Sequence, residues 1–164
     1  NQDKLRWING EHIRKLTLDE FVKIGMEFIN PECGEQWFRK LAELYHPRVK
    51  TLVEFKEEFN IFISDDVQYN QEAVEKFLKK DKVSDILDVT KKRLEKIDSF
   101  TQENIEKEAR ALIEELKIDS AELIHPLRVA VTGKAVSAGV FEVLALLGKD
   151  KVITRLDNIL RAKL

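Results

Sequence analysis

The sequence is poor in the residues that make turns. It has six glycines and three prolines in 164 residues. No glycine occurs between Gly34 and Gly133, and no proline between Pro47 and Pro126. A β-sandwich or β-barrel needs turn residues about every 8–12 positions, so an all-β fold is excluded. The glycines also lie in the wrong places for a dinucleotide-binding or P-loop domain.

Cysteine and long apolar runs are scarce too. Cys33 is the single cysteine, which excludes an internal disulfide framework and a zinc site built from several cysteines. No apolar run approaches the roughly 20 residues that span a bilayer, and no leader pattern of charged and then apolar residues opens the chain. We therefore expect a cytoplasmic protein without membrane contact. Because the chain begins at Asn1 and not at Met, we expect a piece of something longer.

Helical periodicity runs through almost the whole sequence and predicts an all-α fold with no substantial sheet. Thr17–Glu20 and Thr51–Glu54 each fit a capping box, in which the threonine oxygen and the glutamate carboxylate satisfy N–H groups at a helix start. Further helices are expected at about 35–45, 71–80, 83–98, 102–117 and 140–147. Gly148 is placed to end the last of these in the left-handed conformation. The polar segment 64–70 is the best linker candidate.

The charge of the chain is unevenly distributed. The formal net charge is −2, but residues 125–164 carry a local charge of +4 and residues 1–124 one of −6. A non-specific nucleic-acid coat needs a broad basic field, which this balance does not supply. A basic C-terminal part on an acidic scaffold suits selective recognition better.

No residue pattern predicts catalysis or metal binding. The histidines, His12, His46 and His125, lack the spacing of a helical metal pair. Gly133-Lys134 resembles the end of a P-loop, but Ala135 replaces the Ser or Thr that would hold magnesium. We therefore expect no catalytic residue, no metal site and no cofactor in this chain.

Two segments, HPR at 46–48 and HPLR at 125–128, share a pattern of histidine, proline and a following arginine. Proline favours the first helical position, so the pattern predicts Arg48 and Arg128 in the first turn of the helices that follow. A cation there opposes the helix dipole, which indicates a role toward phosphates or base edges. The structural alternative is an arginine folded over apolar neighbours.

Two other features leave a choice between structure and function. In the loop 133–139, Ser137 either caps the helix that begins at Val140 or contacts a ligand. An apolar stripe recurs at helical spacing at Leu52, Phe55, Phe59 and Phe62. Such a stripe is usually core, but an exposed one would make the chain a helical protein-interaction module that binds a partner helix, which is our alternative function.

Four segments resemble a known family. They are, in chain order, Lys4–Arg14, Pro47–Leu52, Pro126–Gly133 and Gly139–Lys149. Their order and spacing are similar to the C-terminal part of bacterial glutamyl-tRNA synthetases over essentially all 164 residues. The last two segments are specific, whereas residues 70–120 form generic helix.

The resemblance implies a cage-like, all-helical anticodon-binding module. Residues 1–16 would end the stem-contact region, 17–68 form a first helical subdomain and 69–164 a second. The implied partner is tRNA(Glu), with tRNA(Gln) left open, and neither DNA nor a membrane. The parent would be a monomeric enzyme that attaches glutamate to tRNA with ATP and Mg in its catalytic domain. That domain's nucleotide-binding motifs are missing here, so this chain alone is expected not to be catalytic.

The resemblance also implies a set of site residues. Arg48 would discriminate the third anticodon base, and Arg128 would contact the first. The same base-binding surface would be lined by His125, Ser137, Ala138 and Val140. Ala138 departs from the family, which usually has proline there, and His125 stands where glutamine is common. Backbone phosphates would be held by Lys134, Lys149 and Arg155.

Overall fold

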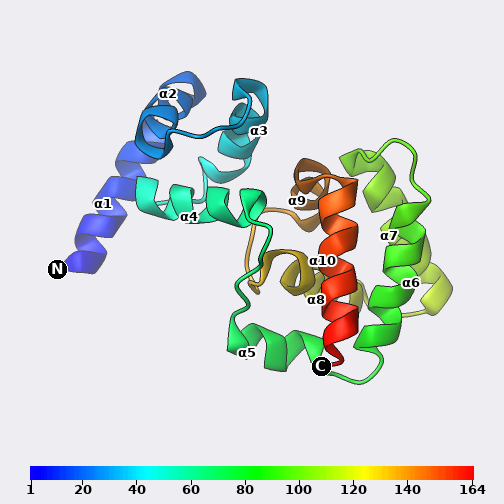
Figure 1. Ribbon diagram of the computed structural model, residues 1–164. Helices are drawn as coiled ribbons and strands as arrows, with labels where there is room; N and C mark the ends of the chain where they lie inside the picture. The colour runs from blue at the N-terminus through cyan, green and yellow to red at the C-terminus, as the bar shows by residue number, and fades with distance from the viewer. The chain divides into compact units, whose positions relative to one another are not determined.

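The computed structural model describes residues 1–164 and contains ten α-helices and one π-helical turn, with no strand (Figure 1). The all-α prediction is therefore confirmed. The chain divides into two compact units, Asn1–Ser64 and Asp65–Leu164. The division falls at the start of the polar segment 64–70. No helix is both long enough and apolar enough to cross a membrane.

The first unit contains four helices. They are α1 (Gln2–Lys15), α2 (Leu18–Ile29), α3 (Glu35–Tyr45) and α4 (Leu52–Ile63). The predicted capping box opens α2, where Thr17 Oγ1 accepts from the Glu20 N–H at 3.2 Å and the Glu20 carboxylate accepts from the Thr17 N–H at 2.7 Å. At α4, Thr51 caps the Glu54 N–H at 3.1 Å. The second box is only half formed, because the Glu54 carboxylate accepts from the Lys50 N–H instead.

Phenylalanine rings fill the core of the first unit. The ring centroids of Phe21 and Phe55 are 4.8 Å apart, and those of Phe38 and Phe55 are 5.5 Å apart in an edge-to-face arrangement. Phe59 and Phe62 are 4% and 2% exposed. The stripe on α4 is thus core, and the alternative prediction of an exposed groove for a partner helix is wrong.

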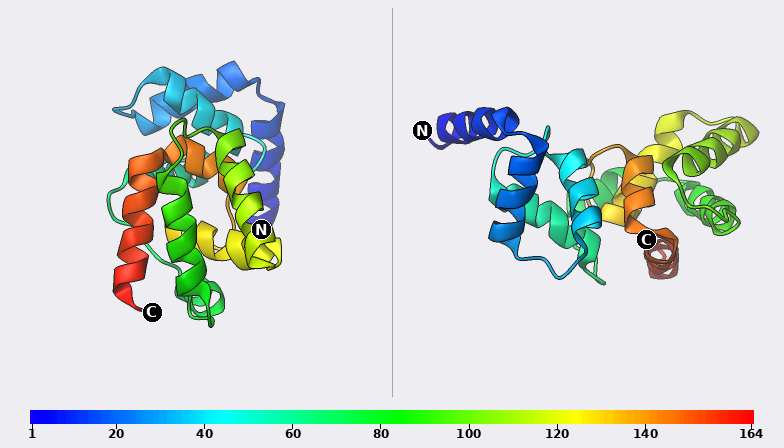
Figure 2. Two further views of the ribbon diagram at one scale, coloured as in Figure 1. Left: turned by 90° about the vertical axis from the view of Figure 1, so that its right-hand side faces the viewer. Right: turned by 90° about the horizontal axis from the view of Figure 1, so that it is seen from above.

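The second unit is built around one central helix. Its elements are α5 (Gln71–Ala73), the π-helical turn η1 (Val74–Leu78), α6 (Val83–Glu95), α7 (Gln102–Leu116), α8 (Ser120–Thr132), α9 (Val140–Leu147) and α10 (Lys149–Ala162). Helix α8 contacts η1, α6, α7, α9 and α10. Figure 2 shows the ribbon from two further sides. The apolar side chains that α8 turns toward these helices are fully buried as a result, among them Leu123, Leu127 and Val129.

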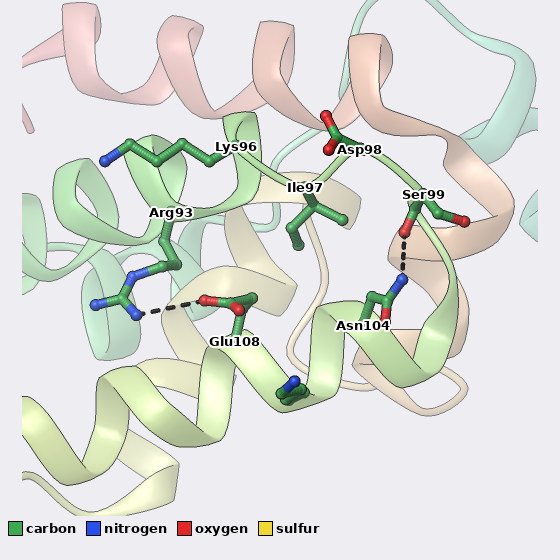
Figure 3. A pocket seen from close by; sticks show the side chains of 8 residues that line it. Arg93, Lys96, Ile97, Asp98, Ser99, Asn104 and Glu108 are labelled. Carbon is green, nitrogen blue, oxygen red and sulfur yellow. Dashed lines mark hydrogen bonds and ion pairs between the residues drawn. The ribbon is translucent and has the colours of Figure 1, made fainter.

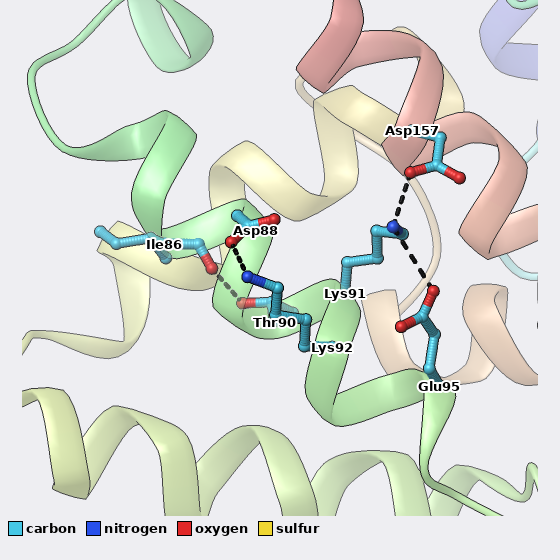
Figure 4. Close-up of polar contacts among 7 residues, drawn as sticks. All are labelled: Ile86, Asp88, Thr90, Lys91, Lys92, Glu95 and Asp157. Carbon is cyan, nitrogen blue, oxygen red and sulfur yellow. Dashed lines mark hydrogen bonds and ion pairs between the residues drawn. The ribbon is translucent and has the colours of Figure 1, made fainter.

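An ion-pair network joins α6 to α10 (Figure 4). Lys91 Nζ lies 2.7 Å from Asp157 Oδ1 and 3.4 Å from Glu95 Oε1. The hydrogen bond to Asp157 is the main cause that raises the pKa of Lys91. Beside it, the buried Thr90 Oγ1 donates to the Ile86 carbonyl at 2.6 Å, so this hydroxyl is satisfied inside its own helix. The Lys91–Asp157 pair holds together two helices that both pack on α8.

The two prolines after histidine do not open helices. Pro126 lies inside α8, which begins at Ser120 because the Glu122 carboxylate accepts from the Asp119 N–H at 3.1 Å. Pro47 lies in the turn between α3 and α4. The prediction that Arg48 and Arg128 occupy first helical turns is therefore wrong, because the capping residues and the buried face of α8 set the helix starts.

Gly133 ends α8 and fixes the start of the loop that follows. Its φ is +76° in the left-handed region, and its carbonyl accepts from the Asn70 N–H at 2.9 Å. A Cβ added at Gly133 would lie 2.1 Å from the Gln68 carbonyl oxygen, so only glycine fits. Gly148 also has positive φ, but its ψ of 155° lies outside the left-handed helical region that the sequence predicted.

Candidate nucleic-acid interface

Arg128 is held between its own helix and the loop that follows it. Its Nε donates to Ser137 Oγ at 3.1 Å, and its Nη1 lies 3.4 Å from His125 Nδ1. Ser137 Oγ in turn donates to the Ala138 carbonyl at 2.6 Å. The structure thus brings together four of the residues that the resemblance assigned to base binding. Ser137 is not a cap, because α9 begins after Gly139 without a side-chain cap.

An aromatic ring completes this group, which we call the Arg128 cluster: Phe77, His125, Arg128 and Ser137. The rings of Phe77 and His125 stack with centroids 5.0 Å apart and an interplanar angle of 27°. Lys76 Nζ lies 5.2 Å from the centroid of the Phe77 ring. Sequence analysis missed Phe77, which lies in a stretch that looked like generic helix and is far from His125 along the chain.

Ala138 and Val140 lie beneath the surface. Their exposed fractions are 0% and 4%, because both side chains pack into the unit. Their side chains are thus not part of the exposed surface, and the role of these two residues in base binding stays a prediction. The exposed apolar group of this loop is Val136, at 79% exposure, which sequence analysis did not single out.

The three predicted phosphate contacts differ in their surroundings. Lys134 is half-buried in the loop beside the Arg128 cluster, and its N–H donates to Thr132 Oγ1 at 3.1 Å. The Lys149 side chain is engaged within the protein, because its Nζ donates to the Ile97 carbonyl at 2.8 Å. Arg155 is 1% exposed, and its Nη1 donates to the Val131 carbonyl at 2.6 Å. Burial lowers the pKa of Arg155. Arg155 also lines a hollow of about 580 Å³ beside Lys149, and its contact with a phosphate stays a prediction.

Arg48 lies in the first unit, exposed on the turn after α3. The turn is well anchored on both sides of it. His46 Nε2 is 2.7 Å from the Ile13 carbonyl, and its ring stacks on Phe21 with centroids 4.6 Å apart. Val49 is 3% exposed. A rigid turn therefore presents an exposed guanidinium to solvent.

A hollow of about 630 Å³ lies at the connection between α6 and α7 (Figure 3). None of the residues predicted for the site lines it. Arg93 at its edge is paired with Glu108 at 3.3 Å and with Glu115, and Asn104 Nδ2 donates to the Ser99 carbonyl at 2.8 Å. No group of three or more His, Cys, Asp or Glu side chains could hold a metal ion.

An arginine held beside stacked rings and a loop is suited to the splayed bases of single-stranded RNA. On an all-helical scaffold, such a group is of the kind that helical RNA-recognition domains present. A family model described as "Anticodon binding domain" matches residues 17–160. The chain therefore belongs to the anticodon binding domain family.

Similar proteins include glutamate–tRNA ligases. Glutamate–tRNA ligase 2 of Thermoanaerobacter pseudethanolicus is 32% identical over 161 residues, which cover 94% of this chain and 34% of that protein. The glutamate–tRNA ligase of Bacillus subtilis is 34% identical over 167 residues, with 95% and 34% covered. The solved glutamate tRNA ligase of Elizabethkingia meningosepticum matches the fold with a TM-score of 0.84, at 16% identity, over 98% of this chain and 32% of that one. The chain thus spans about a third of the length of these relatives.

Proposed function

We propose that this chain recognises the anticodon loop of tRNA(Glu) as the C-terminal third of a glutamate–tRNA ligase. The family membership and the named relatives support the enzyme class. The observation that carries the proposal furthest is the Arg128 cluster. It joins an arginine, a histidine and a serine with an aromatic ring at the edge of one loop.

The Arg128 side chain is preorganised for base recognition in the RNA-free chain. A guanidinium is planar and always charged, and it donates in a fixed fork that fits the polar edge of a base. Its contacts with Ser137 and His125 fix the plane of that fork. A side chain ordered in advance loses less entropy on binding, which favours affinity for the matching base. In this proposal Arg128 reads the first anticodon base.

Arg48 reads the third base from the first unit. Its exposed position on an anchored turn supports this role. Lys134 contacts a backbone phosphate beside the Arg128 cluster. Residues 17–68 and 69–164 then act as two helical anticodon-binding subdomains, and residues 1–16 end the region that contacts the tRNA stem.

The rest of the proposed enzyme lies outside this chain. Glutamate would be attached to tRNA with ATP and Mg bound by the parent's catalytic domain, in a monomeric enzyme of the cytoplasm. The wider alternative is a parent that also accepts tRNA(Gln). Discrimination of the third anticodon base by Arg48, which the resemblance implies, favours the narrower specificity.

The test removes Arg128 and compares two RNAs. Binding of labelled stem-loops is measured by fluorescence anisotropy, one loop with the tRNA(Glu) anticodon and one with its first base changed. Arg128→Ala should weaken the first complex roughly 5- to 150-fold, which is the worth of one bidentate base contact, and the second much less. Arg161→Ala, which removes an exposed arginine on α10, is the matched control for charge and should affect both RNAs alike. Equal losses on both RNAs in Arg128→Ala would contradict the base-reading role.

A further inference from the structure

The Arg128 cluster begins at a break in regular helix. Between Val74 and Leu78 the chain forms a π-helical turn, and the Lys79 N–H donates to the Val74 carbonyl at 3.2 Å. Such turns hold one extra residue, shift the side chains that follow, and recur at functional sites. Val74 and Leu78 are both 5% exposed and anchor the turn in the core. Phe77 stays half-buried between them, with its ring against His125.

The contact between His125 and Arg128 depends on how the imidazole is oriented. A guanidinium only donates, so His125 Nδ1 must accept the contact at 3.4 Å and the ring proton must sit on Nε2. A ring rotated by half a turn would present a carbon to Arg128. Phe77 stacks on one face of the imidazole and fixes the plane of the ring, and within that plane only the orientation with Nδ1 toward Arg128 accepts the contact. The orientation of Arg128 therefore depends on the plane in which the Phe77 ring holds the imidazole.

From this arrangement we infer that Phe77 is a positioning residue for base recognition. It acts through His125 to hold the Arg128 guanidinium in the plane that reads the base. Ser137, in the loop before α9, accepts from the same guanidinium. The guanidinium of Arg128 is therefore held by His125 on α8 and by Ser137 in this loop. This inference rests on the proposed function and adds a residue on η1 to the specificity of that site.

The experiment removes the ring and keeps the packing. Phe77→Leu is compared with Phe77→Tyr, which keeps an aromatic face, and with Phe100→Leu, which removes a half-buried ring packed against the same core away from the cluster. The first readout is the position of the imidazole proton of His125, followed by ¹H–¹⁵N NMR in the RNA-free chain. The second is the ratio of dissociation constants for the loop with a changed first base and the matching loop.

Phe77→Leu should move part of the His125 population away from the Nε2–H form and lower the ratio roughly 2- to 10-fold, as expected for loss of one aromatic pair. Phe77→Tyr and Phe100→Leu should keep the wild-type ratio. An unchanged ratio in Phe77→Leu, or an equal fall in Phe100→Leu, overturns the inference. Should Phe77→Leu fail to fold, Phe77→Met takes its place.

Failure of the proposed function would give a different result. In that case the wild-type chain shows no preference between the two loops. The position of the His125 imidazole proton in the RNA-free chain then still tests whether Phe77 orients the imidazole. If Phe77→Leu leaves it unchanged, Phe77 does not orient the imidazole.

Discussion

Replacing Gly133 by alanine should destabilise the second unit by about 2–3 kcal/mol. The left-handed φ of +76° costs an alanine roughly 1–2 kcal/mol. The new Cβ would also lie 2.1 Å from the Gln68 carbonyl oxygen, a backbone atom that must move. That movement strains the hydrogen bond from the Asn70 N–H to the Gly133 carbonyl, which is worth about 1 kcal/mol.

Urea unfolding followed by circular dichroism measures this change. Gly139→Ala is the matched control at the other end of the same loop. Its φ is −51°, and the three atoms nearest to an added Cβ belong to the Glu142 carboxylate, at ordinary contact distances of 3.5–3.7 Å. The control should stay within about 0.5 kcal/mol of the wild type. A Gly133→Ala variant as stable as Gly139→Ala would refute the argument that this position requires glycine.

The remaining predictions concern two lysines and one tyrosine. Lys134→Ala should weaken every stem-loop about equally and reduce the slope of log affinity against log salt by about 1, as for loss of one phosphate contact. Lys149→Ala should leave that slope unchanged and lower the free energy of unfolding by about 1 kcal/mol, because its Nζ donates to the Ile97 carbonyl. The hydroxyl of Tyr69 donates to the Ala130 carbonyl at 2.8 Å. Burial raises the pKa of Tyr69 to about 12. Because the unfolded chain releases this proton near pH 10, stability should hold up to pH 10 and fall from there to pH 12.

Each of these predictions has its own contradicting result. In salt titrations, each lysine variant serves as the control for the other. A smaller slope of log affinity against log salt in Lys149→Ala would show that Lys149 contacts a phosphate. For Tyr69, Tyr69→Phe removes the titrating group. Absorbance titration of the wild type and this variant isolates its ionisation, and a midpoint near pH 10 would contradict the burial argument.

Local patterns predicted the elements of the fold well. The helix expected at 35–45 is α3, Glu35–Tyr45, and the box at Thr17 forms as its side chains require. The rule for proline failed at Pro126, because the Glu122 cap and the buried face of α8 set a start six residues earlier. The signal within one helical turn therefore held at Thr17 and failed at Pro126, where burial competed with it.

The candidate site was harder to predict, because charge and residue type do not reveal burial. Arg155 and Arg128 look alike in a basic C-terminal segment, yet one donates to a carbonyl in the core and the other to a serine at a loop. Phe77 meets His125 only through tertiary packing, after a π-helical turn that helical periodicity does not predict. The resemblance supplied Arg128 and Ser137, and the structure supplied the contacts that join them.

The measurement that tests the central claim most directly is binding of this chain to three labelled anticodon stem-loops at one moderate salt concentration. The loops are those of tRNA(Glu), tRNA(Gln) and an unrelated tRNA. The account predicts tightest binding to the tRNA(Glu) loop and weakest binding to the unrelated one. Equal binding to all three, or binding to none, would contradict the claim that these two helical units read an anticodon.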